Sequence, residues 1–521
     1  RSVIENNPEV SVLIIGGGVN GIGVYRDLAL QGVDVLLVDR EDFCSGASAA
    51  SSHMAHGGVR YLENGEFRLV REAVQERNWL IENAAHYVKP LPTVIPIFKW
   101  FSGLLNAPLK FLGVMDKPAE RGALVIKIGL MLYDAYTRNQ GTVPRHQFKF
   151  REEALREYPQ LNPEVLCIAR YFDGSISCPE RLCIDMLYDV SKNTTQAHAV
   201  NYLSAVDVMN GGVVLQDVLT GKDYIVYPNL VINAAGPWID LTNQALGKET
   251  NYISGTKGSH LVLDHPKLHS ALEGKEFFFE NDDGRIVLLF PLKGNVLVGT
   301  SDIYIENPDE ARCTEEETDY FFEMIDKVFP GITVKREQIV FQFSGVRPLP
   351  KSDAARSGQV SRDHSIEVLE SMGELGVPVW SLVGGKWTTF RAFAEQVTDR
   401  ALRFLGRFRR QSTNELPIGG GRHYPQSENE RQRWLQKMSE KNNLPISRLR
   451  ELFDRYGTRA SDIAGFIGAG VDQPFESLGS YSHRELAYIS RHEMIVHLDD
   501  ILLRRSLLAM LGQLSSTSLG E

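Results

Sequence analysis

Apolar residues run without interruption from Val10 to Ile15 and stop at the glycines 16–18. A short apolar run that ends in glycine predicts a strand buried on both faces, as in a parallel sheet. Residues Asn20 to Gln31 follow as a helix that Gly32 ends, and Asp34 to Asp39 (DVLLVD) form a second apolar strand. A strand, a helix and a strand within about thirty residues predict a βαβ unit, the start of a doubly wound sheet.

The hydrophobic pattern changes character further along the chain. Residues Leu230 to Ala235 (LVINAA) are another apolar run, closed by Gly236 and Pro237, and they predict a further buried strand. Residues from about 251 to 346 contain several short strand patterns, and the chain from Pro417 onward is helical and charged. No apolar run reaches the roughly 18 residues of a membrane-spanning helix, so no such helix is predicted.

The composition is that of a folded protein with more than one domain. Of 521 residues, 43% are hydrophobic and 23% are charged, which excludes a disordered or fibrous chain. This length exceeds what one hydrophobic core supports, so we expect roughly two or three domains. The net charge of −10 repels a phosphate backbone and argues against nucleic acid as a partner. A local cluster of Arg and Lys can still attract a small anionic substrate.

Neither disulfides nor a metal are predicted to carry the function. The five cysteines are an odd number and no two have the C-x-x-C spacing, so we expect reduced, mostly structural thiols. No Cys/His cluster has zinc spacing, and no metal site is expected. His492 and His497 form H-E-x-x-x-H, and a separation of five residues on a helix turns two side chains about 140° apart, so they cannot share a metal. The charges of this segment are interpreted as structural.

The turn after the first strand carries a phosphate-binding pattern. Gly16, Gly18 and Gly21 form G-x-G-x-x-G between a predicted strand and a predicted helix. The first glycine permits a tight turn, the second lets the backbone approach a pyrophosphate, and the third lets the helix pack on the strand. The pyrophosphate then lies against the helix N-terminus, and Asp39 ends the second strand where an acid can bind the adenosine ribose. We predict dinucleotide binding, with a glycine-rich structural turn as the alternative.

The βαβ unit alone does not separate NAD from FAD. The chain after Asp39 is rich in small and hydroxyl residues from Ser45 to Ser52, and HGGVRY follows at 56–61. Such a loop could pass close under a bulky planar ring, but an ordinary flexible loop has the same composition. The residues by themselves leave these two interpretations equal.

Longer motifs along nearly the whole chain resemble those of the FAD-dependent glycerol-3-phosphate dehydrogenases. They are IIGGGVNGIG at 14–23, SSHMAHGGVRYLENGEFRLVREA at 51–73, INAAGPW at 232–238, KGSH at 257–260, GTSD at 299–302, FSGVRPL at 343–349, SRDH at 361–364, GGKWTTFR at 384–391 and RHEMIVHLDDILLRR at 491–505. Motifs such as SGVRP and HGG-x-RYLE are much more specific than the glycine turn. The chain departs from the family pattern at Tyr25, Gln31 and Phe390, which are packing positions, and segment 94–121 looks longer than usual.

The resemblance implies a fold of class α/β plus α. We expect a Rossmann-like FAD-binding domain with an inserted strand-rich substrate domain and a C-terminal helical domain. The FAD-binding domain would be discontinuous, over residues 8–92, 163–250 and 340–405. Residues 93–162 and 251–339 would form the substrate, cap and membrane-facing segments, and residues 412–521 the helical domain.

The resemblance also implies an activity and its partners. Sn-glycerol 3-phosphate would be oxidised to dihydroxyacetone phosphate, with FAD held noncovalently and the electrons passed to a membrane quinone. The alternatives are an oxidase of the same substrate that passes electrons to oxygen and produces hydrogen peroxide, another FAD-dependent amine or hydroxyacid oxidoreductase, and a flavin protein without turnover. The expected location is peripheral, on the cytoplasmic face of a bacterial inner membrane, with the mitochondrial inner membrane or the cytoplasm as alternatives. Homodimer formation is left open.

Oxidation of a secondary alcohol removes a hydride and a proton, and a phosphate needs paired donors. The flavin takes the hydride, and His260 in KGSH is the predicted base, since a histidine has an unperturbed pKa near 6.5. A hydrogen-bonded core histidine is the alternative, and His56 is a second candidate that more readily lies beside the flavin. Because the guanidinium fork matches phosphate oxygens in pairs, Arg347 and Arg362 are the predicted phosphate ligands. A surface or interdomain ion pair is the alternative for each.

The remaining candidates lie in two loops. Lys386 follows two glycines and would offset negative charge on the reduced flavin, unless it is a solvent lysine at a helix start. Thr388 and Thr389 would donate to cofactor or substrate, or cap the helix that begins there. The predicted catalytic residues are His260, Arg347 and Lys386, and the predicted substrate ligands are Arg60, Tyr61, Arg347, Arg362 and Thr389. The predicted cofactor contacts are Gly16, Gly18, Gly21, Asp39, Ser48, Ser51, Ser52, His56, Gly58, Gly236, Gly385, Lys386 and Thr388.

Segment 98–132 predicts contact with a membrane surface. Residues 98–115 mix aromatic and apolar residues with Lys99 and Lys110, and an apolar run at 128–132 follows further basic residues. Aromatic rings lie at the depth of lipid headgroups and lysines meet anionic lipids, so this mixture suits a bilayer interface. A pair of ordinary core helices is the alternative.

Overall fold

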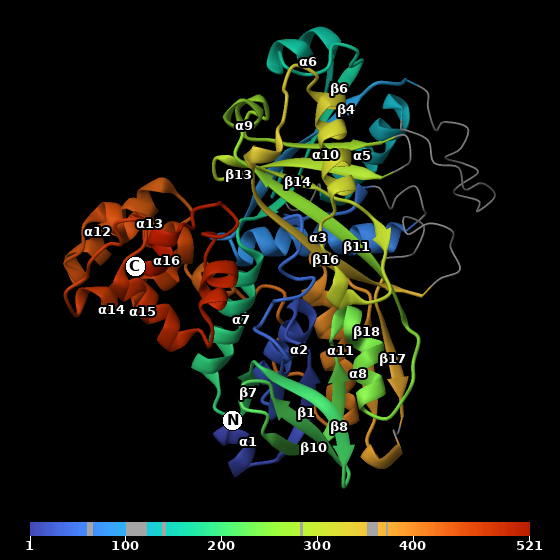
Figure 1. The fold of residues 1–521 in the computed structure, drawn as a ribbon, viewed down its shortest axis with the longest axis vertical. Coiled ribbons are helices and arrows are strands. Elements are labelled where there is room, and N and C mark those ends of the chain that lie inside the picture. The colour runs from blue at the N-terminus through green and yellow to red at the C-terminus, as the bar shows by residue number, and fades with distance from the viewer. Residues whose placement is uncertain (60–65, 101–121, 138–141, 282–284, 352–362, 371–372) are drawn as a thin grey trace.

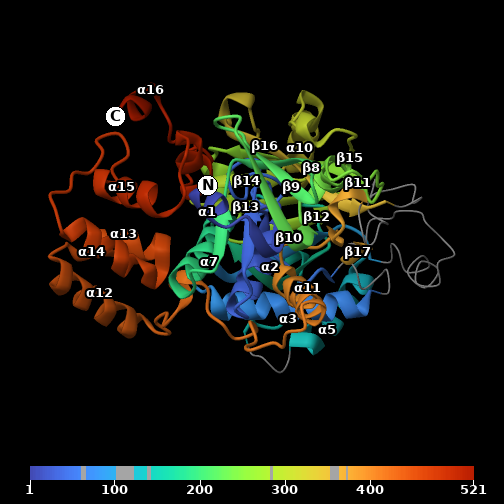
Figure 2. The same cartoon turned by 90° about the horizontal axis from the view of Figure 1, so that it is seen from below.

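The structure is a computed structural model that describes residues 1–59, 66–100, 122–137, 142–281, 285–351, 363–370 and 373–521. Two mixed sheets lie one above the other along the long axis of the molecule, and the C-terminal helices lie against one flank (Figure 1). Seen from below, the same helices stand beside α7 (Pro179–Asn193) and away from the sheets (Figure 2). The architecture confirms the predicted α/β plus α class.

The lower sheet is built on the predicted βαβ unit. Its strands run in the order β17-β18-β10-β1-β2-β7, and β9 and β8 extend it from β10. The strands are β1 (Glu9–Ile15), β2 (Val35–Val38), β7 (Ala197–Val200), β8 (Leu203–Met209), β9 (Gly212–Asp217), β10 (Asp223–Asn233), β17 (Ser365–Leu369) and β18 (Val379–Val383). Strand β1 is parallel to both β2 and β10, and β10 is parallel to β18. Parallel pairing is what the continuous apolar runs predict.

Both faces of β1 are buried, which explains its unbroken apolar run. Val12 and Ile14 join a core with α2 (Val19–Leu30), α7 and α11 (Phe390–Phe404), whereas Leu13 and Ile15 join a second core on the other face. Successive side chains of a strand point to opposite faces, so a strand covered on both sides needs apolar residues at every position. The β1 C-terminus and the α2 N-terminus are thereby fixed against each other.

The upper sheet combines strands from several parts of the chain. Its strands run β15-β11-β14-β13-β12-β4-β6-β3, with β16 beside β11 and β5 beside β6. They are β3 (Met54–Ala55), β4 (Val88–Ile97), β5 (Gln147–Phe150), β6 (Cys167–Ile176), β11 (Ile253–Leu263), β12 (Glu276–Glu280), β13 (Ile286–Leu292), β14 (Asn295–Gly299), β15 (Ile303–Tyr304) and β16 (Ile339–Pro350). The helices of this part are α3 (Phe67–Asn83), α5 (Ala123–Thr137), α6 (Arg151–Glu157), α9 (Pro266–Ala271) and α10 (Glu315–Val328).

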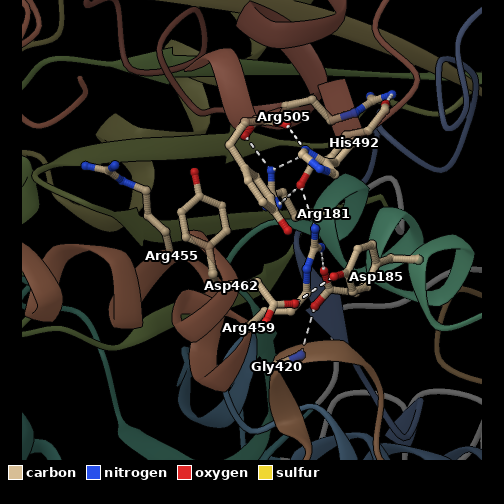
Figure 3. A network of polar contacts seen from close by, with 12 residues as sticks. Arg181, Asp185, Gly420, Arg455, Arg459, Asp462, His492 and Arg505 are labelled. Atoms are coloured by element: carbon tan, nitrogen blue, oxygen red, sulfur yellow. Dashed lines mark hydrogen bonds and ion pairs between the residues drawn. The ribbon is translucent and has the colours of Figure 1, made fainter. Parts of the chain in front are cut away.

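The helices beyond α11 form the C-terminal part. They are α12 (Glu428–Asn442), α13 (Ile446–Tyr456), α14 (Ala460–Gly468), α15 (His483–His492) and α16 (Ser516–Gly520). A buried ion-pair network joins this part to α7, and Figure 3 shows Arg181, Arg459 and Arg505 within it. Glu493 accepts from Arg181 at 2.8 Å and from Arg459 at 2.9 Å. Arg505 reaches from the same network to Asp42, at 2.7 Å.

The helix assumed across His492 and His497 is wrong, because α15 ends at His492 and a π-helical segment, Asp500–Arg505, begins beyond His497. No group of three or more potential metal ligands occurs within the described ranges. Every helix in the described part of the chain falls short of the length or the apolar character that a bilayer crossing needs.

Candidate active site

The glycine turn connects β1 to α2 in a space too small for side chains. Gly16 has φ +111°, and a Cβ there would lie 2.5 Å from the carbonyl oxygen of Ala234. A Cβ on Gly21 would lie 1.9 Å from the carbonyl oxygen of Gly16, and one on Gly18 would lie 3.1 Å from Ser48 Oγ. The geometry therefore assigns Gly16 to the turn, Gly21 to helix packing and Gly18 to close approach, as the motif requires.

Asp39 stands at the end of β2 beside this turn. Its carboxylate accepts from the Gly17 amide at 2.6 Å and from the Glu41 amide at 2.8 Å. Burial raises the pKa of Asp39 to about 7, although both amide contacts favour the charged form. Ser48 Oγ accepts from the Val19 amide at 2.9 Å, at the start of α2. Both side chains are thus ordered around the helix N-terminus where a pyrophosphate and a ribose would lie.

The HGG segment is held by contacts from three directions. The His56 amide donates to Thr388 Oγ1 at 3.0 Å, and the Gly57 amide donates to Asp173 Oδ1 at 3.0 Å. Tyr133 Oη on α5 lies 3.1 Å from the Gly57 amide, and a Cβ on Gly57 would lie 2.3 Å from that oxygen. The backbone at 56–57 therefore connects the GGK segment to buried groups of the upper sheet and of α5.

The GGK segment packs against the start of α2. Gly385 has φ +96°, and a Cβ there would lie 2.9 Å from Asn20 Nδ2. Trp387 Nε1 donates to the Ser48 carbonyl oxygen at 3.0 Å. Lys386 is only 8% exposed, so it is not the solvent lysine of the alternative interpretation. Thr389 precedes α11 but its side chain makes no cap hydrogen bond, and its hydroxyl is buried with no partner among the described residues.

His260 lies on β11 and faces the loop that follows the βαβ unit. Its Nε2 is 2.9 Å from Ser52 Oγ, and its ring stacks on Phe343 with centroids 4.8 Å apart. Nδ1 is buried and has no hydrogen-bond partner among the described residues. Burial, helped by the charges of Arg347 and His53, lowers the pKa of His260 to about 3. The imidazole is therefore neutral at physiological pH and keeps a nitrogen lone pair.

Arg347 lies on β16, next to β11. Its guanidinium donates to Thr300 Oγ1 at 2.9 Å, to the Ser301 carbonyl oxygen at 3.2 Å and to Asp302 Oδ1 at 3.2 Å. The side chain is 23% exposed, so it is neither a free surface group nor fully enclosed. The SGVRP and GTSD motifs are thereby brought into direct contact.

The other predicted residues are distributed as follows. Ser51 Oγ accepts from the His53 amide at 3.4 Å, Gly58 has φ +71°, and Gly236 has φ +59° with no atom within 4 Å of a built Cβ. Arg60, Tyr61 and Arg362 lie outside the described residues.

Two buried polar side chains could not be predicted as site residues from the sequence, because they carry no motif of their own. Asn20 Oδ1 is buried beside Gly385 with no partner among the described residues, and the signal was a polar residue between the last two glycines of the turn. Glu317 is buried behind KGSH and GTSD, and its only signal was the capping-box spacing Thr314-x-x-Glu317.

These residues fit an FAD molecule. The narrow turn at Gly18 would admit the cofactor's pyrophosphate, the Asp39 carboxylate at the end of β2 could accept from a ribose hydroxyl, and the buried Asn20 and Thr389 oxygens would offer polar contacts to a bound group. His260 of the upper sheet then meets Ser52 of the loop that follows the βαβ unit. The arrangement joins a dinucleotide cradle to a histidine and an arginine.

Comparisons with known proteins agree with this arrangement. A family model described as FAD-dependent oxidoreductase matches residues 11–400, and a model described as the C-terminal domain of alpha-glycerophosphate oxidase matches residues 411–519. A glycerol-3-phosphate dehydrogenase of Synechocystis is 32% identical over 97% of this chain and 91% of that protein. A D-erythritol 1-phosphate dehydrogenase of Brucella abortus is 28% identical over 95% of this chain and 93% of its own.

A solved structure supports the fold as a whole. The glycerol-3-phosphate dehydrogenase of Bacillus halodurans, complexed with FAD, superposes with a TM-score of 0.72 at 23% identity. The match covers 99% of this chain and 89% of that one. The fold and the site define an FAD-dependent oxidoreductase. The Synechocystis relative matches over nearly the full length of both proteins, which narrows the class to the glycerol-3-phosphate dehydrogenases. The chain belongs to the FAD-dependent glycerol-3-phosphate dehydrogenase family.

Proposed function

We propose that this chain oxidises sn-glycerol 3-phosphate to dihydroxyacetone phosphate by hydride transfer to FAD and passes the electrons to a membrane quinone. The observation that carries the proposal is the meeting of His260, from the upper sheet, with Ser52, from the loop after the βαβ unit, 2.9 Å apart. Arg347 lies on the strand next to that of His260. In this proposal His260 is the proton acceptor and Arg347 the phosphate ligand, on two neighbouring strands.

Arg347 binds the substrate phosphate in this proposal. Its partners include the neutral oxygens of Thr300 and Ser301 and the carboxylate of Asp302, and its side chain is 23% exposed, so the guanidinium is accessible to a dianion. A guanidinium donates two parallel hydrogen bonds to phosphate oxygens, which fixes the orientation of the ester as well as its affinity. Arg60, Tyr61, Arg362 and Thr389 are proposed as further ligands of the same substrate.

His260 accepts the hydroxyl proton in this proposal. An imidazole with a pKa of about 3 is a weak base, but a phosphate dianion near Arg347 opposes the positive field that contributes to this low value. Substrate binding therefore raises the basicity of His260 in the complex. Ser52, at Nε2, orients the ring, and the unpartnered Nδ1 is the other nitrogen that can hold a proton.

FAD, when bound, accepts the hydride and carries the electrons onward. Lys386 is a buried cation in the GGK segment, and we assign it to offsetting the negative charge that hydride acceptance brings to the site. Asp39, Ser48 and the glycines of the turn hold the adenosine and pyrophosphate end.

The electron acceptor is the finer part of the proposal. A quinone is supported by the dehydrogenase names of the relatives, whereas the C-terminal family model carries the name of an oxidase. Hydrogen peroxide formed in stoichiometric amount with the product would favour oxygen and overturn the quinone assignment. Reduction of a soluble quinone analogue without peroxide would support it.

We further propose that α5 lies on a membrane surface. Leu124, Ile128, Met131 and Leu132 form one exposed stripe at helical spacing, and Ile128 and Met131 are 51% and 57% exposed. Lys127 is exposed within the same stretch, and an apolar stripe with a lysine suits anionic lipid rather than water. The double variant I128E/M131E should no longer float with anionic liposomes. L219E, at an exposed leucine in the turn between β9 and β10, should float as the unaltered protein does. Equal flotation of all three proteins would contradict the proposal.

An anaerobic titration tests the activity directly. Purified holoprotein is mixed with glycerol 3-phosphate and the visible flavin absorbance is followed. Bleaching by glycerol 3-phosphate supports the proposal, and absence of bleaching overturns it. A parallel titration with erythritol 1-phosphate addresses the substrate named for the Brucella relative, and stronger bleaching there would move the assignment to the longer polyol phosphate.

A further inference from the structure

We propose that Glu317 is a positioning residue for the substrate site, a buried carboxylate that fixes the segments carrying Arg347 and His260. It acts through Ser301 and Ser259, and it touches neither substrate nor cofactor in this assignment. The inference rests on the proposed function, because Arg347 and His260 are the residues whose placement it explains.

Glu317 lies in the first turn of α10 and is only 4% exposed. Its two oxygens have separate partners. Oε2 accepts from Lys257 Nζ at 2.8 Å and from the Thr314 amide at 2.8 Å, which completes a capping box. Oε1 accepts from the hydroxyls of Ser259, at 2.8 Å, and Ser301. A helix cap needs only the Oε2 contact, so the Oε1 contacts serve the strands that face α10.

The Ser301 contact leads directly to Arg347. The carbonyl oxygen of Ser301 accepts from both terminal nitrogens of Arg347, each at 3.2 Å. The neighbouring Thr300 and Asp302 side chains accept from the same guanidinium. Because Glu317 holds the Ser301 hydroxyl, it fixes the peptide on which the guanidinium rests.

The Ser259 contact leads to His260. Ser259 immediately precedes His260 on β11, and its amide donates to Ser301 Oγ at 2.9 Å. The Ser259 hydroxyl also lies 2.7 Å from Ser344 Oγ on β16, the strand that carries Arg347. One carboxylate oxygen thereby joins β11, β16 and the segment between β14 and β15.

The network keeps Glu317 charged. Burial by itself would raise its pKa, but Lys257, the two serine hydroxyls and the Thr314 amide together lower it below the ordinary value. Lys257 is itself buried and also donates to the Arg312 carbonyl oxygen at 2.7 Å. A glutamine at position 317 therefore leaves the buried Lys257 ammonium without its counter-charge. Its amide NH2 group would also face groups that themselves donate hydrogen bonds.

The test uses holoprotein of E317Q with E316Q as the matched control, since Glu316 is the exposed neighbour in the same turn. In E317Q we expect KM for glycerol 3-phosphate to rise about tenfold, because one charge-assisted contact is lost, while the FAD dissociation constant changes little. E316Q should behave as the unaltered protein. S301A, which removes the hydroxyl but keeps the carbonyl, should raise KM in the same direction and tests the link if E317Q does not fold.

A second readout separates this inference from the proposed function. Inorganic phosphate is titrated into each holoprotein, and the dissociation constant is taken from the flavin difference spectrum. We expect an approximately tenfold weaker constant for E317Q and an unaltered one for E316Q. If glycerol 3-phosphate fails to bleach the unaltered protein, the proposed activity fails, and the phosphate constants still decide the role of Glu317. Equal phosphate constants, or a fall in melting temperature with no change in KM, would overturn the inference.

Discussion

His260 Nε2 lies 2.9 Å from Ser52 Oγ, across a sequence separation of 208 residues. The histidine belongs to β11 of the upper sheet and the serine to the loop that leaves the βαβ unit. The contact therefore connects the loop after β2 to the strand that pairs with the strand of Arg347.

Replacing Arg347 by alanine should weaken the substrate complex. Hydrogen bonds to charged groups contribute about 1.5–3 kcal/mol, so kcat/KM for glycerol 3-phosphate should fall roughly 10- to 150-fold. R347K should recover only part of this, because an ammonium lacks the bidentate fork. Steady-state kinetics with FAD-saturated protein is the measurement. R336A, at an arginine that pairs with Glu315 and Asp319 on the surface, is the control, and an unaltered kcat/KM in R347A would remove Arg347 from the site.

Replacing His260 by alanine should slow the chemical step. Loss of a general base lowers kcat by about 10²–10⁴-fold, and FAD content should be retained, because His260 is placed on the substrate side. In the free protein the pKa of His260 is about 3, so protonation of this group should not produce an acid limb near pH 6.5 in kcat/KM. Rapid reduction of the flavin by glycerol 3-phosphate, followed across pH, checks both points. H492A, at an exposed histidine of the C-terminal part, should leave kcat unaltered.

FAD affinity should rise with pH through about 7. The pKa of Asp39 is raised to about 7 in the cofactor-free protein by burial, so below that value the carboxyl is protonated and a poorer acceptor for ribose hydroxyls. Since binding favours the carboxylate, the dissociation constant should be roughly tenfold larger at pH 6 than at pH 8. Fluorescence titration of apoprotein with FAD measures it.

The same shift affects the stability of the apoprotein. The pKa of Asp39 in the folded protein lies above its unfolded value of 3.8, so between these two pH values the folded protein binds a proton that the unfolded chain does not. The contribution of Asp39 to the free energy of unfolding therefore declines as pH rises from about 4 to 7.

D39N should abolish the pH dependence of FAD affinity. A dissociation constant that is flat from pH 6 to pH 8 in the unaltered protein would contradict the assignment of Asp39 as the ribose acceptor.

Breaking the buried ion-pair network around Glu493 should lower the stability of the protein. Glu493 is buried between Arg181 and Arg459, and removal of one partner from a buried charged cluster costs about 3–5 kcal/mol. E493Q should therefore lower the free energy of unfolding and the melting temperature of the holoprotein. D454N, which breaks an ion pair with Arg431 in which Asp454 is 54% exposed, should cost no more than about 1 kcal/mol. Calorimetry gives the melting temperatures of both variants. Equal melting temperatures for E493Q and D454N would show that the network around Glu493 contributes nothing to stability beyond a surface ion pair.

Local regularities in the sequence determined the dinucleotide half of this protein. The unbroken apolar run of β1, the spacing of Gly16, Gly18 and Gly21, and Asp39 at the end of β2 act over short stretches of chain. The burial of a strand on both faces and the absence of a Cβ in a turn are physical requirements that leave a direct trace in residue type. The longer motifs similarly placed His260, Arg347 and Lys386 among the candidates, although residue type alone did not assign their roles.

Only the tertiary structure decided what those side chains contact. Glu317 gave a capping-box signal and nothing more, yet its second oxygen reaches Ser259 and Ser301 on other elements. The pKa of His260 likewise depends on burial and on the charge of Arg347, which come from packing between strands. Hydrogen bonds and desolvation act at a few ångströms, and residues far apart in the chain reach that distance only when the sheets have formed.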